Sequence, residues 1–343
     1  MNKNTIYQIA EQVGVSPSTV SRAISGRGYC GIQTKAKIME AAKSLNYAPD
    51  HAAKMLKTRK TNKIIFAAPD ICNPFYFDMI NGINQVAEEY GYLLILFYTK
   101  HRLSEELKAI QNVKERVADG MIMVSFHFCE ENIGAINRLP APVVLTNQYE
   151  SPGGGDRFDY VYVDTFTGIK QGTEHLIRQG MKRIGFIGGC LGEQTGYQRY
   201  SGYREALQEA GLPLEDTLIA ESDYTENGGY LAARKLIMQK SRPQAIVAAN
   251  DLMAIGVMHA CEEAGLSIPH DMAVVGMDNL DISSRVHPKL TSVSLMQEEI
   301  GSRAAQMLMD RLHGREVSEK AVKIMPELVV RQSSAEVKDQ ITH

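Results

Sequence analysis

Residues 5–26 have the sequence TIYQIAEQVGVSPSTVSRAISG, and they decide the fold of the N-terminal part of the chain. Their first apolar side chains recur at helical spacing, and Gly14 follows them as a residue that accepts the left-handed conformation at a helix end. Ser16 and Pro17 then favour a second helix, because serine caps a helix and proline suits its first turn. Two short helices joined by a glycine turn, the second with small polar residues and Arg22, predict a helix-turn-helix.

The second helix has side chains that a DNA major groove admits. Short side chains near its beginning let the backbone approach the base edges, and Arg22 can bond either a guanine or a phosphate. A helix of any small domain can begin with the same residues, so the pattern alone also allows a purely structural role. On the DNA-binding interpretation, the contacting residues of this region are Thr5, Ser16, Pro17, Ser18, Thr19, Ser21 and Arg22.

Residues 34–45 and 49–60 complete the N-terminal part. The first range predicts a third helix that closes a small core, so we expect a helical domain over residues 1–48. In the second range, Pro49 ends that helix and Asp50 can cap a helix of about eight residues, which is marginal alone in water. We expect this hinge helix to form against DNA, with a plain linker helix as the alternative. Its predicted DNA contacts are Ala53, Lys54, Leu56 and Lys57. The leucine would act as an apolar wedge and the two lysines would bond phosphates.

Charge separates the first 60 residues from the rest of the chain. They hold ten Lys and Arg and three Asp and Glu, a net +7, so residues 61–343 carry −10 of the total of −3. A basic segment on an acidic body favours an anionic partner for that segment, either nucleic acid or a membrane surface. A solvated charged segment without a partner has the same composition.

The sequence has no sign of a membrane or an oxidising compartment. No run of 18 or more apolar residues occurs, and residues 1–12 lack the layout of a secretory signal, so we expect a cytoplasmic protein. The five cysteines show no metal-ligand spacing, and we expect them to be reduced. They are Cys30, Cys72, Cys129, Cys190 and Cys261.

From residue 62 onward, β-rich runs alternate with helical patterns. The runs are nearly continuous in apolar residues, which is typical of parallel sheets covered by helices on both faces. About ten strands are more than one twisted sheet commonly holds, so we expect two doubly wound α/β lobes. The predicted strands are residues 63–68, 92–98, 120–124, 143–146, 160–163, 183–188, 245–249 and 272–276. The predicted helices are residues 75–90, 103–116, 168–179, 197–210, 228–239 and 252–264.

This fold class includes many enzymes, but the motifs of catalysis are missing from the sequence. No GxGxxG follows a strand, and IGFIGG at residues 184–189 lacks its spacing. The motifs GxxxxGK[ST], GxSxG and HExxH are absent, and the nine histidines do not cluster. We therefore expect no catalysis, no metal and no cofactor.

Three segments together resemble the LacI/GalR family of transcription regulators. They are residues 5–26, KIMEAAKSLNYAPD at residues 37–50, and AAKMLK at residues 52–57. The resemblance implies a homodimer whose recognition helices enter successive major grooves of a near-palindromic operator, with Pro17, Ser18 and Arg22 at the base-reading positions. Two residues depart from the family pattern: Asp50 stands where Asn is usual, and Lys54 where Arg or Gln is usual. The sequence offers no explanation for Cys30.

The rest of the chain resembles the periplasmic-binding-protein-like sensor of the same family. By resemblance, the effector-binding residues are Phe75, Tyr76, Asn147, Arg199, Tyr224, Asn250 and Asp278. An arginine with carboxylate and amide groups can satisfy vicinal hydroxyls, and aromatic faces suit a sugar or a flat base. Structural roles remain open: Asn250 can cap a helix, Tyr76 can be core, and Arg199 can pair with a carboxylate. Asp251 and Asn279 are expected to be structural.

These observations predict a sequence-specific transcriptional regulator, a repressor, that responds to a small molecule between two lobes. A sugar or sugar derivative is the first effector class. A corepressor of purine or nucleoside type and a phosphorylated carrier protein are the alternatives inside the family; a solute-binding protein or an enzyme is the alternative outside it. The predicted first lobe comprises residues 61–162 with 291–320, the second 163–290 with 321–333, and a polar tail 334–343.

Overall fold

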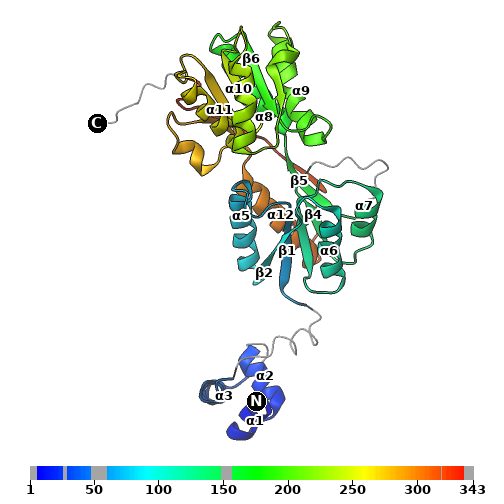
Figure 1. Cartoon of the computed structure of the whole chain (residues 1–343). Coiled ribbons are helices and arrows are strands. Elements are labelled where there is room, and N and C mark those ends of the chain that lie inside the picture. The colour runs from blue at the N-terminus through cyan, green and yellow to red at the C-terminus, as the bar shows by residue number, and fades with distance from the viewer. Residues whose placement is uncertain (1–5, 26–28, 48–59, 148–156, 318, 336–343) are drawn as a thin grey trace, which may run out of the picture. The chain divides into compact units, whose positions relative to one another are not determined.

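The structure is a computed structural model that describes residues 6–25, 29–47, 60–147, 157–317 and 319–335. It divides into two compact units. We call Met1–Lys60 the head and Thr61–His343 the body. Figure 1 colours the head dark blue and the body from lighter blue through cyan, green and yellow to red. No helix in the described ranges combines the length and apolar character that a bilayer crossing requires.

Three helices pack together to form the head. They are α1 (Ile6–Val13), α2 (Pro17–Ser25) and α3 (Ile32–Ser44). Ile9, Val20 and Ile38, one from each helix, have no exposed surface and form the centre of its core. Gly14 follows α1 with a φ of +74°, a conformation that glycine adopts without strain. The predicted helix-turn-helix is confirmed, and the third helix begins two residues earlier than its apolar pattern indicates.

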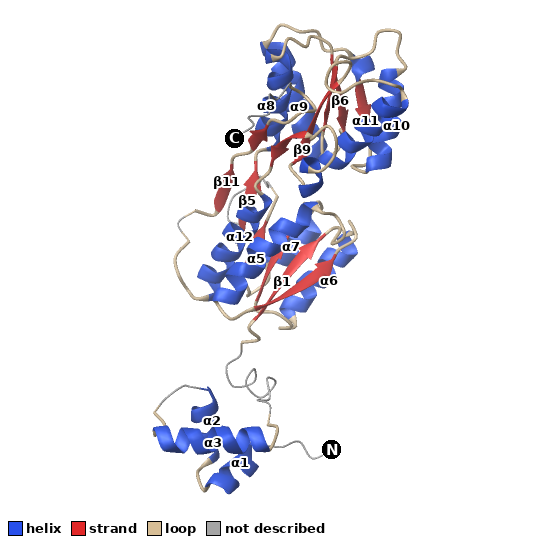
Figure 2. Ribbon diagram, turned by 90° about the vertical axis from the view of Figure 1, so that its left-hand side faces the viewer, coloured by secondary structure: helices blue, strands red, loops and turns tan. Residues whose placement is uncertain are grey.

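The first lobe of the body is a six-stranded parallel sheet between two layers of helices (Figure 2). In sheet order its strands are β11 (Ala321–Ile324), β5 (Asp159–Val163), β4 (Val143–Leu145), β3 (Gly120–Met123), β1 (Lys63–Ala68) and β2 (Leu93–Tyr98). Its helices are α5 (Phe75–Glu89), α6 (Leu103–Lys114), α7 (Glu130–Asn137) and α12 (Gln297–Leu312). Alternate residues of a strand face opposite sides of the sheet. Ile64 and Phe66 accordingly pack with α5 and α12, and Ile65 and Ala67 pack with α6 and α7.

The second lobe repeats this plan with one antiparallel edge strand. In sheet order its strands are β12 (Glu327–Val329), β10 (Thr291–Ser294), β9 (Ala273–Asp278), β8 (Ala245–Ala248), β6 (Ile184–Gly188) and β7 (Ile219–Glu221). Its helices are α8 (Thr165–Arg178), α9 (Gln194–Glu209), α10 (Glu226–Ile237) and α11 (Asp251–Glu263), with short 3-10 turns η1 (Asp216–Leu218) and η2 (Asp281–Ser284). Strand β12 runs antiparallel to β10, and the other pairs are parallel. Helix α8 packs beside α9, and α10 beside α11.

Helices α10 and α11 approach each other backbone to backbone. A Cβ at Gly256 would lie 2.1 Å from the carbonyl oxygen of Glu226, and a Cβ at Gly229 would lie 2.4 Å from that of Met253. Since real Cβ atoms do not come this close to backbone, both positions require glycine. The two helices therefore form a tightly fixed layer on their face of the sheet.

The chain crosses between the lobes three times: after β5, after β10 and after β11. This corrects the predicted lobe boundaries, because residues 291–294 form β10 in the second sheet and residues 321–324 form β11 in the first. Both are strands of four residues, too short for a clear apolar pattern, and β11 joins the first sheet only after the chain has returned from the second lobe. The predicted polar tail also begins too early: Ser334 is buried and donates to the hydroxyl of Thr291 at 2.7 Å.

Candidate functional site

Helix α2 presents a polar face whose beginning is fixed by Ser16. The Ser16 hydroxyl oxygen accepts a hydrogen bond from the Thr19 backbone N–H at 3.2 Å, which is the predicted N-cap, and it lies 2.8 Å from the Ser18 hydroxyl. Ser18 and Arg22 are exposed, and the Arg22 Nε donates to the Ser18 carbonyl oxygen at 3.4 Å. Val20 faces the core. The helix thus has one side for packing and one side of small polar groups with an arginine.

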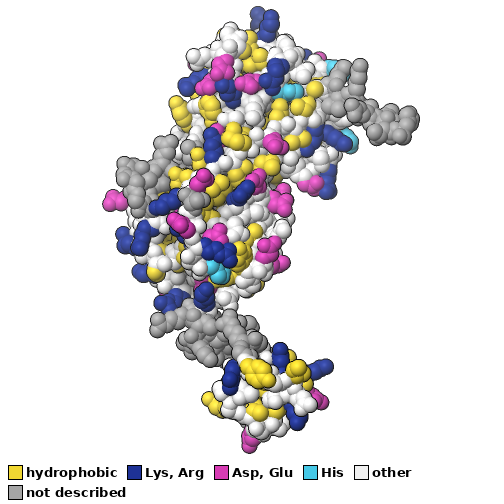
Figure 3. Space-filling model, turned by 180° about the vertical axis from the view of Figure 1, so that it is seen from behind, with side chains coloured by type: hydrophobic (Ala, Val, Ile, Leu, Met, Phe, Trp, Pro, Cys, Tyr) yellow, Lys and Arg dark blue, Asp and Glu magenta, His cyan; other side chains and the backbone are white. Residues whose placement is uncertain are grey.

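The basic charge of the head lies on its surface. Figure 3 shows Lys and Arg side chains spread over the visible face of the head. Lys35, Lys37 and Lys43 on α3 are exposed, as is Tyr29 just before it, with 90% of its surface accessible. Cys30 packs against the head core, which gives this unexplained residue a structural role. The other predicted DNA contacts fall outside the described residues: Thr5, Ala53, Lys54, Leu56 and Lys57.

The body holds a cluster of buried polar atoms near the ends of its strands. The Arg199 guanidinium, on α9, lies 5.3 Å from the ring centroid of Tyr224, a residue of the loop after β7. Asp278 ends β9 and is 4% exposed. Arg199 Nε, the Tyr224 hydroxyl and Asp278 Oδ1 are all buried, and none has a hydrogen-bond partner among the described residues. A buried polar group without a partner costs free energy, so such a cluster is suited to a ligand that supplies the missing bonds.

The first lobe contributes aromatic rings to the same cluster. Phe75 and Tyr76 begin α5, and their rings meet edge to face with centroids 5.1 Å apart. Burial raises the pKa of the Tyr76 phenol strongly, the carboxylates of Asp278 and Asp70 raise it further, and Arg199 lowers it. Phe75 packs against the cores of both lobes, and Asp278 and Arg199 belong to the second lobe, so the cluster lies between the two lobes.

Backbone strain marks the same site. Asp278 has a φ of 112°, Asn279 a φ of 54° and Tyr224 a φ of 63°, all in a region that residues with side chains rarely adopt. Strain of this kind persists only where surrounding contacts hold it, and it is concentrated at binding sites. Burial raises the pKa of the Asp278 carboxyl well above its usual value, while Arg199 opposes that rise. The structure therefore fixes a hard-to-ionise carboxyl opposite an arginine.

Asp251 holds the loop that carries Asp278. Its buried carboxylate accepts hydrogen bonds from the Leu280 N–H at 2.7 Å, the Ser283 hydroxyl at 2.6 Å and the Ser292 hydroxyl at 2.5 Å. Burial raises the pKa of Asp251 to about 6, although these bonds lower it. The sequence-based expectation of a structural Asp251 agrees with this geometry.

Asn279 and Gln297, the first residue of α12, also hold this loop in place. The Asn279 side-chain oxygen accepts a bond from Arg331 at 2.7 Å, in agreement with its expected structural role. The Gln297 side chain, at the beginning of α12, donates to the Asp278 carbonyl oxygen at 2.6 Å. Gln297 was missed from the sequence because no helix was predicted there.

Asn250 and Asn147 differ from the other predicted effector residues. Asn250 caps α11 through a bond from the Met253 N–H at 2.9 Å, and its amide donates to the Tyr224 carbonyl oxygen at 2.9 Å. Both of its polar atoms are thus engaged, so its visible role is to hold the Tyr224 loop. Asn147 accepts a bond from the Ser125 N–H at 3.2 Å in the first lobe, so its side-chain oxygen is engaged away from Arg199 and Asp278.

Gly189, which follows β6, lies against the Tyr224 ring and was missed from the sequence. A Cβ on Gly189 would lie 2.1 Å from the ring carbon Cζ and from the hydroxyl oxygen of Tyr224. In the sequence, IGFIGG at residues 184–189 resembles a nucleotide-binding motif without its spacing. Its last glycine instead makes room for an aromatic side chain.

Comparisons with known proteins agree on both parts of the chain. The family model "Bacterial regulatory proteins, lacI family" matches residues 5–50, and the model "Periplasmic binding protein-like domain" matches residues 173–334. Catabolite control protein A of Priestia megaterium is 34% identical over 331 residues, which cover 96% of this chain and 99% of that protein. The chain belongs to the lacI family. The HTH-type transcriptional repressor PurR of Photorhabdus laumondii is 30% identical over 332 residues, 96% of each chain.

Solved structures of lacI-family members share the fold over nearly the whole chain. The regulator CelR in complex with cellobiose has a TM-score of 0.72 at 28% identity and covers 96% of this chain and 99% of its own. The lac repressor dimer bound to operator has a TM-score of 0.85 at 23% identity and covers 97% and 99%, a likeness of fold. This lacI-family chain is therefore a DNA-binding transcriptional regulator with a small-molecule sensor, and it is not an enzyme.

Proposed function

We propose that this lacI-family regulator is a repressor whose operator affinity is controlled by a sugar or sugar derivative bound at Arg199, Tyr224 and Asp278. The supporting observation is the set of three buried polar atoms without partners beside the aromatic rings of Phe75 and Tyr76. Each sugar hydroxyl both donates and accepts, which a guanidinium, a phenol and a carboxyl can satisfy together. The aromatic rings suit the apolar face of a pyranose.

A purine or nucleoside is the second candidate effector. It is favoured by the relatives named PurR and by the buried rings, which also suit a flat base. The carboxyl of Asp278 can bond either a sugar or a purine. The two ligand classes differ more clearly in how many hydroxyls each ligand carries. A sugar engages Arg199, Tyr224 and Asp278 through several hydroxyls, and a free base engages them through ring nitrogens and one exocyclic group.

We propose that two copies of the chain associate through the β2 side of the first lobe. Strand β2 is an edge strand of its sheet, and Leu93 and Leu96 on it are 61% and 45% exposed. Phe77 on α5, which packs against β2, is 49% exposed. Exposed apolar side chains on an unpaired edge are a liability unless a partner covers them. A homodimer would present two α2 helices to the two halves of a near-palindromic operator.

The proposed mechanism connects the cluster to the head through the body. An effector that bonds Arg199 and Asp278 in one lobe and meets Tyr76 in the other favours one arrangement of the lobes. Residues 49–60 join the body to the helical domain of residues 1–48, and we propose that their hinge helix responds to lobe closure. A coupling of about 1–3 kcal/mol would change operator affinity roughly 5- to 150-fold. Such a regulator acts where the chromosome is, in the cytoplasm.

The test is a fluorescence-polarisation titration of the full chain with a designed near-palindromic operator and with random DNA, repeated with pooled sugars and pooled purines. We expect specific binding with a steep salt dependence and a change in operator Kd with sugars. Asp278→Ala should keep ligand-free operator binding and abolish the response. A response to purines alone would select the second candidate, and an unchanged response in Asp278→Ala would refute the assigned site.

A further inference from the structure

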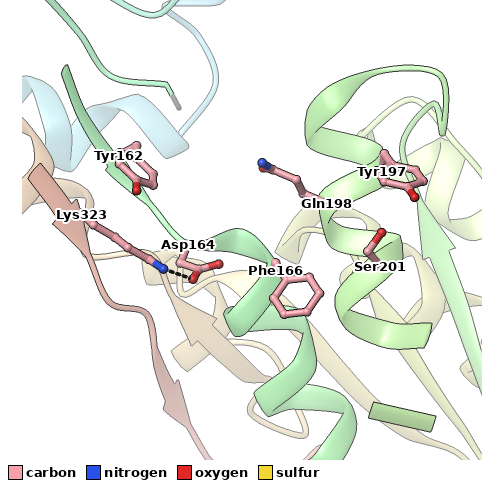
Figure 4. Close-up of a pocket in the computed structure, with 7 residues that line it drawn as sticks. All are labelled: Tyr162, Asp164, Phe166, Tyr197, Gln198, Ser201 and Lys323. Carbon is pink, nitrogen blue, oxygen red and sulfur yellow. Dashed lines mark ion pairs between the residues drawn. The ribbon is translucent and has the colours of Figure 1, made fainter. Parts of the chain in front are cut away.

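A pocket of about 330 Å³ lies where two of the chain crossings meet the second lobe. Tyr162 on β5 and Lys323 on β11 are register partners in the first sheet and line one side. Gln198 and Ser201 on α9 line the other side, with Phe166 of α8 between them (Figure 4). We call it the hinge pocket. Its volume is at the lower end of the range for small-molecule sites, enough for one ring.

The hinge pocket is separate from the effector cluster. Helix α9 carries residues of both on different faces, because Arg199 is about 100° around the helix from Gln198 and about 160° from Ser201. Arg199 lies over Tyr224, while Gln198 and Ser201 face Tyr162 and Phe166. A ligand in one site therefore does not occupy the other.

The charges of the hinge pocket balance each other. Lys323 Nζ lies 2.5 Å from Asp164 Oδ2, and the same carboxylate caps α8 through bonds from the Thr167 N–H at 3.0 Å and hydroxyl at 2.8 Å. Burial works to raise the pKa of Asp164, and the bonds from Lys323 and Thr167 outweigh it and lower that pKa. Because Lys323, the one ammonium among the described residues that line the pocket, is already paired, an anionic ligand gains no net charge attraction there.

The remaining groups suit a neutral polyhydroxylated ring. The Ser201 hydroxyl is buried and has no hydrogen-bond partner among the described residues, and Lys323 uses one of its three N–H donors on Asp164. Phenol, amide and carboxylate groups add donors and acceptors that match alternating hydroxyls. The rings of Tyr162, Phe166 and Tyr197 supply apolar faces.

We propose that the hinge pocket is a second ligand site, for a neutral monosaccharide. Its walls come from β5 and β11 of the first lobe and from α8 and α9 of the second, so an occupant contacts both sides of the hinge. A ligand with different contacts in two lobe arrangements shifts their populations. The hinge site therefore modulates the response to the ligand at Asp278 and does not compete with it.

The experiment detects binding in a chain whose effector cluster is disabled. Saturation-transfer NMR with D-glucose, D-galactose and D-ribose, each up to about 50 mM, is recorded on full-length Asp278→Ala. We expect at least one sugar to give a signal that adding Ser201→Leu or Lys323→Met weakens at least tenfold in affinity. The Lys323 side chain is 46% exposed, so this second variant places no larger side chain in the interior. Gln208→Leu, an exposed position on α9, is the matched control and should leave the signal unchanged.

Two outcomes would overturn the hinge site: no sugar binds Asp278→Ala, or the signal persists in both pocket variants. Neither outcome bears on the proposed function. That function is tested separately by measuring how the effector changes operator binding in the wild-type chain and in Ser201→Leu. If that response disappears in Asp278→Ala and survives in Ser201→Leu, the effector cluster stands whether or not the hinge pocket binds a sugar.

Discussion

Replacing Gly189 with alanine tests whether the Tyr224 ring binds the effector. The new Cβ would lie 2.1 Å from the ring, and ordinary contact begins near 3.4 Å, so the ring must move by more than 1 Å. The ring centroid is now 5.3 Å from the Arg199 guanidinium, and an attraction of this kind extends to about 6 Å. The same shift displaces the Tyr224 hydroxyl from the position in which it would bond the effector. Losing that hydrogen bond of about 0.5–1.5 kcal/mol lowers effector affinity roughly 2- to 13-fold.

The assay is the effector concentration that gives a half-maximal change in operator polarisation. Gly192→Ala, in the same loop, is the matched control because its Cβ would meet only the Cys190 sulfur at an ordinary 3.6 Å. Operator binding without effector should be equal in wild type and both variants. If Gly189→Ala responds like the wild type, or if Gly192→Ala loses as much as Gly189→Ala, the reasoning about the Tyr224 ring is wrong.

Three further predictions concern stability and the hinge. Gly256→Ala forces a Cβ against the backbone of α10 and should lower the free energy of unfolding by about 1–3 kcal/mol or more. Gly134→Ala is the control, because its Cβ meets only the flexible Arg138 side chain, and it should be neutral or stabilising by up to about 1 kcal/mol. Urea unfolding measures both changes. Asp251 has a pKa of about 6 when folded, above its usual value, so its contribution to stability is present below about pH 4 and is lost as pH rises through about 6. Asp251→Asn should remove that part of the slope of the urea midpoint between pH 4 and 7, and an unchanged slope would contradict the assignment. Leu56→Gly should weaken operator binding and leave effector binding intact; calorimetry showing loss of both would contradict the hinge role.

Much of the fold could be predicted because the buried parallel strands consist of nearly continuous runs of apolar residues in the sequence. Strand β1 occupies its predicted range, and the β3 and β8 ranges differ from prediction by one residue at one end. The missed elements were short strands, three of them at sheet edges, and helices with mixed faces. Strands β7, β10, β11 and β12 have three or four residues each, and a run that short has no usable period.

The candidate site was predictable in composition and less so in geometry. Resemblance named Tyr76, Arg199, Tyr224 and Asp278, and the structure brings these four residues together. The resemblance could not distinguish residues that face the ligand from residues that support them. Asn250 was therefore predicted to bind the effector together with residues whose polar atoms have no partner among the described residues. That difference depends on hydrogen bonds between segments far apart in the chain, and no local pattern encodes them.

The three crossings between the lobes set the order in which the body can fold during synthesis. The first sheet lacks β11 and its covering helix α12 until residues 297–324 have been made, whereas most of the second lobe is complete by Ser294. Domains commonly fold N-terminal first as they leave the ribosome. In this chain the head can do so, but the N-terminal lobe must wait for the C-terminal one. A nascent chain therefore carries a finished DNA-binding head long before it has a sensor to control it.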